Sequence, residues 1–137
     1  MIGLEEYYWC FEKAIPKNIC DEIEAIQFTK YKPDQFYTWH ADDLPTPFGE
    51  KSHPNYRGKV RKLSATINLT DPNKYTGGDF EIDLRNNEQG RNIITLDKIK
   101  AQGTVVVFPS FVTHQVRPVT SGERTSLVIW SLGPPWR

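Results

Sequence analysis

The sequence predicts a mainly β fold, in the form of an antiparallel sandwich or jelly roll. Short segments rich in β-branched and aromatic residues follow one another along most of the chain, and turn-forming groups such as Asp71-Pro72-Asn73 and Gly77-Gly78 separate them. Helical periodicity is clear only once, near the N-terminus. A chain of 137 residues has the size of one domain, so we expect a single domain over residues 1–137.

The first expected element is a supporting helix over residues 16–28. Pro16 suits the first turn of a helix, and acidic residues follow it. Ile19, Ile23 and Ile26 recur at helical spacing. This pattern predicts an N-terminal helix whose apolar face packs on a sheet.

Two strands are expected next, on either side of a long loop. Residues 35–42 are aromatic and compatible with an extended chain. Residues 63–70 alternate between apolar side chains, expected in the core, and polar side chains, expected to line the other face. The loop over residues 44–58 holds three prolines and two glycines, and loops of this length in compact domains are often functional.

Two more strands are expected in the second half of the chain. Residues 104–108 are rich in valine and predict a strand buried on both faces. Residues 126–130 predict the last strand, and residues 96–99 suggest a helical turn before the pair.

Composition argues against some classes of partner. Lys plus Arg and Asp plus Glu number 17 each, so no overall charge attracts the chain to nucleic acid or to an anionic membrane. No apolar run is long enough to span a bilayer, and the N-terminus lacks the layout of a signal peptide. We expect a soluble cytoplasmic protein, in the host cytoplasm if a phage encodes it.

The two cysteines, Cys10 and Cys20, do not form a closely spaced pair typical of a zinc or redox motif. In a cytoplasmic protein they are expected to be reduced thiols, with a disulfide that closes the N-terminal loop as the alternative.

Four residues carry the functional prediction. His40 and Asp42 are two residues apart, so on an extended strand both side chains project from one face and can share an ion. With His114 from a downstream strand, two imidazoles and one carboxylate can bind one face of Fe(II), which leaves positions open for a co-substrate and dioxygen. Arg124 can then hold a carboxylate of the co-substrate. The pattern indicates an oxygenase.

These residues resemble those of the Fe(II)- and 2-oxoglutarate-dependent dioxygenases, in the prolyl 4-hydroxylase-like branch. Within that branch the chain looks most like the small bacterial and phage hydroxylases of the PKHD type. The resemblance implies a double-stranded β-helix, which is a cupin-like jelly roll. It runs from Tyr31 to Trp130 and rests on Tyr31 and residues 37–42, 61–66, 77–80, 103–109 and 114–124.

The resemblance implies a role for each site residue. His40, Asp42 and His114 would be the catalytic iron ligands, and Arg124 would bind the far carboxylate of 2-oxoglutarate. Dioxygen would be the second co-substrate, and ascorbate is a candidate reductant. Five further residues would bind or line the site of 2-oxoglutarate, with an ordinary core or strand role as the alternative for each: Tyr31, Tyr37, Ser64, Thr66 and Ser126.

The reaction implied is hydroxylation of a substrate C–H bond with release of succinate and CO2. A peptidyl proline is the first candidate substrate, followed by another protein side chain or a small molecule. Neither nucleic acid nor a membrane is an expected partner, and the oligomeric state is open.

Three alternatives remain. A catalytically inactive jelly-roll binding or scaffold protein would not need the complete set of His40, Asp42, His114 and Arg124. A nucleic-acid base dioxygenase would share the cofactors but is expected to carry a basic groove. A zinc hydrolase could use the same ligand types without requiring Arg124.

The other prominent residues are expected to have structural roles. His53 should be a solvated loop residue, Gly77-Gly78 a turn or bulge, and Trp39 and Trp130 packing residues. Lys59, Arg61 and Lys62 should form a solvated strand end.

Overall fold

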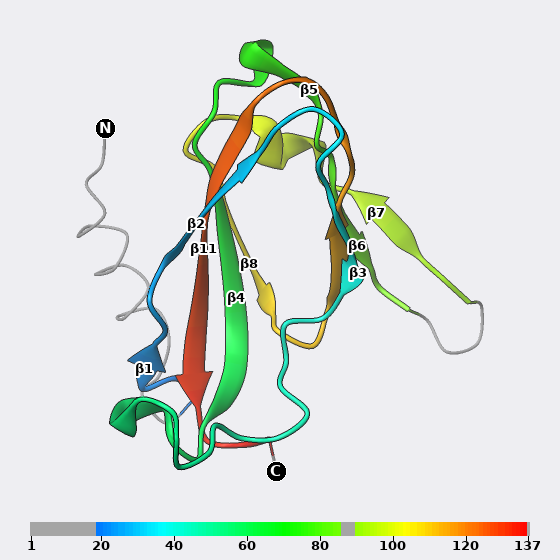
Figure 1. Ribbon diagram of the computed structural model, residues 1–137. Coiled ribbons are helices and arrows are strands. Elements are labelled where there is room, and N and C mark those ends of the chain that lie inside the picture. The colour runs from blue at the N-terminus through cyan, green and yellow to red at the C-terminus, as the bar shows by residue number, and fades with distance from the viewer. Residues whose placement is uncertain (1–18, 86–89, 137) are drawn as a thin grey trace.

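The protein is described here by a computed structural model that covers residues 19–85 and 90–136. The fold is mainly β, as predicted, and its strands form two sheets that face each other (Figure 1). The larger sheet has the order β1-β11-β4-β8, and β2 also pairs with β11. The smaller sheet has the order β3-β9-β6-β7, and β5 pairs with β10 as a separate ribbon. Every strand pair is antiparallel.

The strands and the short 3-10 turns (η) follow in chain order: β1 (Glu22–Ile23), β2 (Gln27–Tyr31), β3 (Tyr37–His40), η1 (Pro54–Tyr56), β4 (Val60–Asn68), η2 (Pro72–Lys74), β5 (Tyr75–Gly77), β6 (Phe80–Asp83), β7 (Ile93–Thr95), η3 (Asp97–Lys100), β8 (Val105–Pro109), β9 (Thr113–Val116), β10 (Val119–Gly122) and β11 (Arg124–Gly133).

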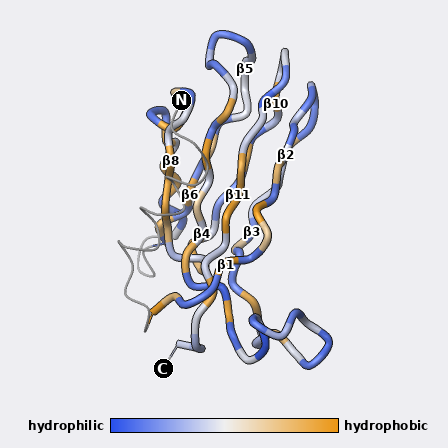
Figure 2. The backbone as a smooth tube through the Cα atoms, turned by 90° about the vertical axis from the view of Figure 1, so that its left-hand side faces the viewer, coloured by the Kyte–Doolittle hydropathy of each residue, from blue (hydrophilic) through white to orange (hydrophobic). Residues whose placement is uncertain are grey.

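Two apolar clusters stabilise the larger sheet, one on each face. The alternation predicted over residues 63–70 is seen in β4, where Ala65 and Ile67 pack with Leu127 and Ile129 of β11. The other cluster lies between the sheets and joins residues of both: Tyr31, Phe80, Ile99, Phe108, Val116 and Val119. Figure 2 shows the hydrophobic stretches along the strands and the hydrophilic residues in the loops at both ends.

The helix predicted over residues 16–28 is wrong for its described part. Residues 16–18 lie outside the described residues, and the rest forms β1, a connection and the start of β2. Ile23 and Ile26 still reach the core, but from an extended chain that packs on the apolar face of β4 and β11. The helical spacing of the isoleucines was therefore accidental, because β1 pairs with β11 at Glu22 and Ile23 and β2 pairs with it from Gln27 onward, which holds this segment extended.

The strand predicted over residues 104–108 is present as β8, but the expected burial on both faces is wrong. Among the described strands, β8 pairs only with β4, and it forms an edge of the larger sheet. Val107 is 48% exposed. A run of valines suits either a doubly buried strand or an edge strand with one open face, and the sequence does not separate the two.

The predicted turns and loops are confirmed. The helical turn expected over residues 96–99 is η3, which buries Ile99. The loop over residues 44–58 contains η1, and the exposed His53 caps that turn by accepting a hydrogen bond from Asn55 N. Trp39 is half-buried, and the Arg91 guanidinium lies 5.5 Å from the centre of its ring.

Cys20 is half-buried, and Cys10 lies outside the described residues, so the redox state of the two thiols stays a prediction. Within the described ranges, no helix is long and apolar enough to cross a bilayer.

Candidate metal centre and co-substrate pocket

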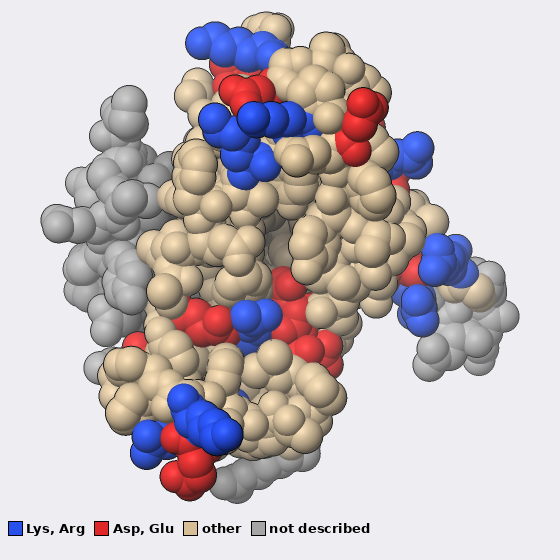
Figure 3. Space-filling model, viewed as in Figure 1, with Lys and Arg blue, Asp and Glu red and all other residues tan. Residues whose placement is uncertain are grey.

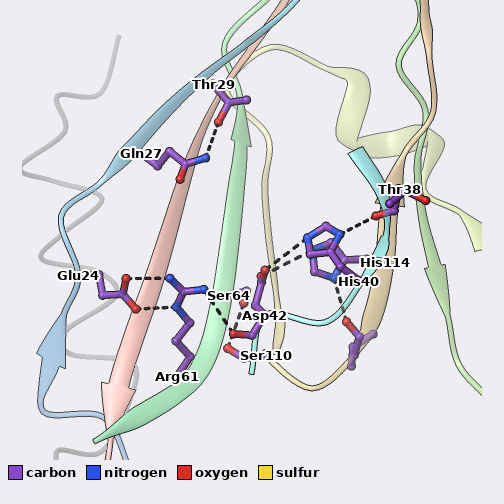
Figure 4. A network of polar contacts seen from close by, with 11 residues as sticks. Glu24, Gln27, Thr29, Thr38, His40, Asp42, Arg61, Ser64, Ser110 and His114 are labelled. Carbon is purple, nitrogen blue, oxygen red and sulfur yellow. Dashed lines mark hydrogen bonds and ion pairs between the residues drawn. The ribbon is translucent and has the colours of Figure 1, made fainter. Parts of the chain in front are cut away.

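The two predicted histidine ligands lie opposite each other on neighbouring strands. His40 ends β3, His114 lies in β9, and the two residues are partners in the antiparallel ladder. Asp42 follows two residues after His40, where its backbone N–H donates to Ser110 O at 2.8 Å. The register of the smaller sheet thus brings His114 beside His40 and Asp42, from which it is distant in the sequence (Figure 4).

The three side chains converge on one point. Asp42 Oδ1 lies 3.5 Å from His40 Nε2, and Asp42 Oδ2 lies 3.6 Å from His114 Nε2. Each Nδ1–H donates to a backbone carbonyl, in His40 to Thr38 O at 2.7 Å and in His114 to Val112 O at 2.9 Å. These hydrogen bonds orient both rings so that each Nε2 points toward the carboxylate and toward a metal ion bound beside it. All candidate ligand atoms lie within 4.8 Å of one another, so these residues fit a single divalent ion bound on one face.

The protonation states also suit a metal. Burial raises the pKa of Asp42, but hydrogen bonds from His40 and Ser64 and the nearby His114 outweigh it and lower that pKa to about 2. Burial lowers the pKa of His114 below its ordinary value of 6.5. At neutral pH the carboxylate is therefore ionised and the His114 imidazole is neutral, which are the forms that bind a metal.

Arg124 is a buried cation without an acidic partner. Its side chain is 2% exposed, and within the described residues no carboxylate lies at ion-pair distance from it. Burial lowers its pKa, while Tyr75 and Tyr31 act in the opposite direction. The guanidinium stays charged at neutral pH. Its Nη1 donates a long hydrogen bond, 3.4 Å, to Ser126 Oγ, and Tyr75 is a second neutral hydrogen-bond partner. Such a group is suited to binding an anion.

The glycine pair predicted as a turn has that role and also makes room for Arg124. Gly77 and Gly78 both have positive φ, 72° and 62°, which favours glycine. A Cβ atom on Gly78 would lie 3.0 Å from Arg124 Cδ. The backbone therefore passes so close to the buried arginine that a larger residue would displace it.

One cavity of about 360 Å³ contains both the three candidate ligands and Arg124. This volume falls within the range of small-molecule sites, about 300–1,000 Å³. The space-filling view shows a hollow between the sheets with a basic side chain flanked by acidic ones at its lower edge (Figure 3). The cavity is lined by residues of both sheets: Gln27, Thr29, Tyr31, Tyr37, His40, Ala41, Asp42, Arg61, Ala65, Thr66, Phe80, Phe108, His114, Val116, Arg124, Ser126, Val128 and Trp130.

Four of the five predicted co-substrate residues line this cavity together with Arg124, and three of the four are buried. Tyr31 lies directly across the β2–β11 ladder from Arg124, and burial raises its pKa, so its hydroxyl remains a hydrogen-bond donor. Thr66 of β4 and Ser126 of β11 are buried cavity residues.

Tyr37 and Ser64, the other two predicted co-substrate residues, lie elsewhere around the site. Tyr37 also lines the cavity, but it is 50% exposed, and its ring stacks edge-on against His40 at 4.0 Å. Ser64 is fully buried and is not one of the lining residues. Its hydroxyl lies 3.0 Å from Ser110 Oγ and supports the Asp42 carboxylate from behind.

The solvated strand end predicted for Lys59, Arg61 and Lys62 is wrong. Lys59 Nζ lies 2.9 Å from Asp21 Oδ1, and Arg61 Nε lies 2.6 Å from Glu24 Oε1. Lys62 is 4% exposed and donates to a backbone carbonyl. Residues from the N-terminal and C-terminal segments of the fold bind these cations, and the local sequence around the cations does not predict such long-range contacts.

Sequence reasoning also missed several cavity residues. Trp130 was expected in the core but lines the cavity. Gln27 was assigned to the helix and Thr29 to no element, yet with Tyr31 they form the cavity face of β2. Their period-2 spacing was the available signal, and the more regular spacing of the isoleucines hid it.

Comparisons with known proteins agree with this geometry. The sequence profile of the 2OG-Fe(II) oxygenase superfamily matches residues 26–132. A PKHD-type hydroxylase of Shewanella sp. strain ANA-3 is 36% identical over 104 residues, which make up 75% of this chain and 40% of that protein. The PKHD-type hydroxylase YbiX of Escherichia coli O157:H7 is 31% identical over 120 residues, 88% of this chain and 46% of that protein.

A solved structure extends the likeness to the fold. The prolyl-4-hydroxylase of Pseudomonas putida superposes with a TM-score of 0.62 at 23% identity, and the match covers 95% of this chain and 63% of that chain. This supports the predicted jelly-roll form of the two sheets. The chain spans less than half the length of the curated relatives named above. The profile match alone covers more than half of the chain, and the chain belongs to the 2OG-Fe(II) oxygenase superfamily.

Proposed function

We propose that this chain is an Fe(II)- and 2-oxoglutarate-dependent dioxygenase that hydroxylates a substrate C–H bond. His40, Asp42 and His114 hold the iron, and Arg124 binds the far carboxylate of 2-oxoglutarate. The observation that carries the proposal is a buried guanidinium that has no acidic partner among the described residues and lies in the same cavity as a two-histidine, one-carboxylate cluster. A zinc hydrolase would use the cluster alone.

The buried arginine argues for an anionic co-substrate. A buried charge is costly unless a partner of opposite sign binds it. A planar guanidinium can bind a carboxylate with two parallel hydrogen bonds. Tyr31 and Ser126 place hydroxyl groups beside Arg124, and we propose that both, with Thr66, line the 2-oxoglutarate site.

The superfamily implies Fe(II), 2-oxoglutarate and dioxygen as the reactants bound here. The bound iron supplies the oxidative chemistry that couples conversion of 2-oxoglutarate to succinate and CO2 with hydroxylation of the substrate. The protein orients the reactants and excludes water: the rings of Phe80 and Phe108 lie 5.5 and 4.7 Å from the His114 ring and form an apolar wall. A role for ascorbate stays a prediction.

A protein, peptide or small-molecule substrate binds at the open side of the cavity, near the exposed Tyr37. The names of the relatives make a peptidyl proline the first candidate, with another protein side chain or a small molecule as alternatives. The equal numbers of acidic and basic residues disfavour a nucleic-acid substrate. The cytoplasmic location and the single-domain organisation stay predictions, and no oligomeric state is proposed.

The test is an anaerobic optical titration of the metal-free chain with Fe(II) and 2-oxoglutarate, which follows the visible charge-transfer band of the iron-bound co-substrate. His114→Ala should abolish the band. Arg124→Met, which keeps the side-chain volume and removes the charge, should raise the 2-oxoglutarate concentration needed for it. Arg117→Met is the matched control, because Arg117 is exposed and its Nη1 lies 3.6 Å from Glu81 Oε1, outside the cavity lining.

A band that needs His114 and weakens selectively in Arg124→Met supports the proposed site. A folded wild-type chain that binds no Fe(II), or that gives no band with both ligands, contradicts the proposal and leaves the inactive binding or scaffold protein as the better reading.

A further inference from the structure

Arg61 lies at the edge of the cavity and touches three other parts of the site. It projects from β4, and its guanidinium lies flat over the Trp130 ring of β11, 3.8 Å from the ring centre. Its Nη1 donates to the backbone carbonyl of Asp42 at 3.4 Å. Its Nε and Nη2 donate to the Glu24 carboxylate at 2.6 and 2.9 Å. Figure 4 shows the guanidinium between Glu24 and Asp42.

Glu24 fixes this arginine from the opposite side. The residue lies between β1 and β2, and its backbone N–H donates to Trp130 O at 3.0 Å. The side chains of Glu24 and Arg61 are only 13% and 20% exposed. Glu24 therefore binds the backbone of Trp130 and, through Arg61, clamps the face of the same tryptophan.

The clamp ends at a metal ligand. The Trp130 indole nitrogen is buried and has no regular hydrogen-bond partner among the described residues, yet the indole is close enough to Asp42 to help lower the pKa of that carboxyl. The backbone of Asp42 is held by Arg61 on one side and by Ser110 on the other. Two of the groups around Asp42, the Arg61 guanidinium at its backbone and the Trp130 indole near its carboxylate, are thus held in place by Glu24.

We infer that Glu24 is a positioning residue of the metal centre: it holds Arg61 flat on Trp130 and against the Asp42 backbone, and so keeps the Asp42 carboxylate aimed at the metal. The inference rests on the proposed metal site. It assigns a function to an acidic residue that neither binds the metal nor lines the cavity.

The physical reason lies in the fork of hydrogen bonds. A bidentate guanidinium–carboxylate pair fixes the plane of the arginine, which otherwise has several flexible torsions. Without Glu24, Arg61 would be a mostly buried cation with no acidic partner, close to a divalent cation. Groups that orient a metal ligand typically change metal affinity by about 10–100-fold, and we expect about a tenfold loss when Glu24 loses its charge.

The experiment is a titration of the metal-free chain with Co(II), in which the visible d–d bands report both affinity and ligand geometry. The principal variant is Glu24→Gln, which keeps the side-chain size. Glu24→Asp keeps the charge but is too short to form both hydrogen bonds, and it serves if Glu24→Gln does not fold. The matched control is Glu123→Gln, since Glu123 is half-exposed and pairs with Lys30 at 3.6 Å, away from the cavity.

A double-mutant cycle shows whether Glu24 acts through Arg61. If it does, the double variant Glu24→Gln with Arg61→Met should bind Co(II) no more weakly than the weaker single variant, because both substitutions remove the same Glu24–Arg61 interaction. Thermal unfolding of the metal-free variants separates a loss of stability from a loss of metal affinity.

The expected result is a roughly tenfold weaker Co(II) affinity and altered d–d bands in folded Glu24→Gln, with Glu123→Gln unchanged. If folded Glu24→Gln has wild-type Co(II) affinity and d–d bands, even with a lower melting temperature, Glu24 forms only a structural ion pair. That result would overturn this inference and leave the proposed metal site intact. Additive losses in the double variant would overturn the route through Arg61. A wild-type chain that binds no Co(II) would overturn the proposed metal site, and the inference with it.

Discussion

Replacing Asp42 by Asn should destabilise the metal-free protein, although Asp42 is proposed as a metal ligand. The carboxylate is 7% exposed and receives hydrogen bonds from its surroundings that a neutral amide cannot replace. These contacts lower its pKa from an ordinary 3.8 to about 2. The folded state therefore favours the ionised carboxylate, and the metal-free fold gains stability from it.

The magnitude follows from proton linkage. The two pKa values differ by roughly 2, and one pH unit corresponds to 1.36 kcal/mol, so the carboxylate contributes about 2 kcal/mol at neutral pH. Because the folded pKa is the lower one, this contribution is complete above pH 3.8 and is lost as the pH falls through 2. Near pH 3 roughly half of it should remain.

The assay is urea unfolding of wild type and Asp42→Asn in the presence of a chelator, at several pH values between 7 and 3. The difference in unfolding free energy should be about 2 kcal/mol at pH 7 and should shrink toward pH 3. A difference that is the same at every pH, or a more stable variant at pH 7, would refute the account of Asp42. In the same preparations Asp42→Asn should have lost Co(II) binding.

Three further predictions concern the rest of the site. Because burial lowers the pKa of His114, metal-free stability should fall as the pH drops below 6.5 toward the folded pKa, and His114→Gln should flatten this fall in urea unfolding; an unchanged pH dependence would contradict it. Gly78→Ala should cost about 1–2 kcal/mol of stability through its positive φ and should also weaken 2-oxoglutarate binding by displacing Arg124. The control Gly90→Ala, with positive φ and open space around it, should lower stability and leave 2-oxoglutarate affinity unchanged. Equal 2-oxoglutarate affinities in the two variants would count against the close approach at Arg124. In thermal unfolding, Co(II) and 2-oxoglutarate should each raise the melting temperature of wild type. Arg124→Met should lose only the rise in melting temperature that 2-oxoglutarate causes. If it also lost the rise that Co(II) causes, the assignment of Arg124 to the proposed anion site would be contradicted.

The sequence predicted the chemistry of the site better than its surroundings. His40 and Asp42 were predicted from their spacing on an extended strand together with the downstream His114 and Arg124. The structure brings the three candidate ligands within 4.8 Å of one another, and their roles as ligands stay a prediction. The β2 face was missed, because the segment that pairs with β11 through β1 and β2 also carries Ile19, Ile23 and Ile26 at helical spacing. Tertiary pairing decided between the two patterns.

Glu24 and Arg61 show why the support of a site is harder to predict than its ligands. They are 37 residues apart, and each is an unremarkable charged residue in its local sequence. Their ion pair forms in the folded protein, where β1 and β4 pair with the two sides of β11 and Trp130 of β11 lies beneath the Arg61 guanidinium.

Strand β11 explains how one sheet face can serve both halves of the proposed reaction. Its alternate residues Arg124, Ser126, Val128 and Trp130 all line the cavity, because successive side chains of a strand point to opposite faces. One end of the strand presents the buried cation, and the other presents the indole beside Asp42. The anion site and the support of the metal site therefore share one rigid backbone, which fixes their separation. A change in the twist or register of β11 would move Arg124 and Trp130 together, so the β1 and β2 contacts that hold this strand should influence metal and 2-oxoglutarate binding jointly.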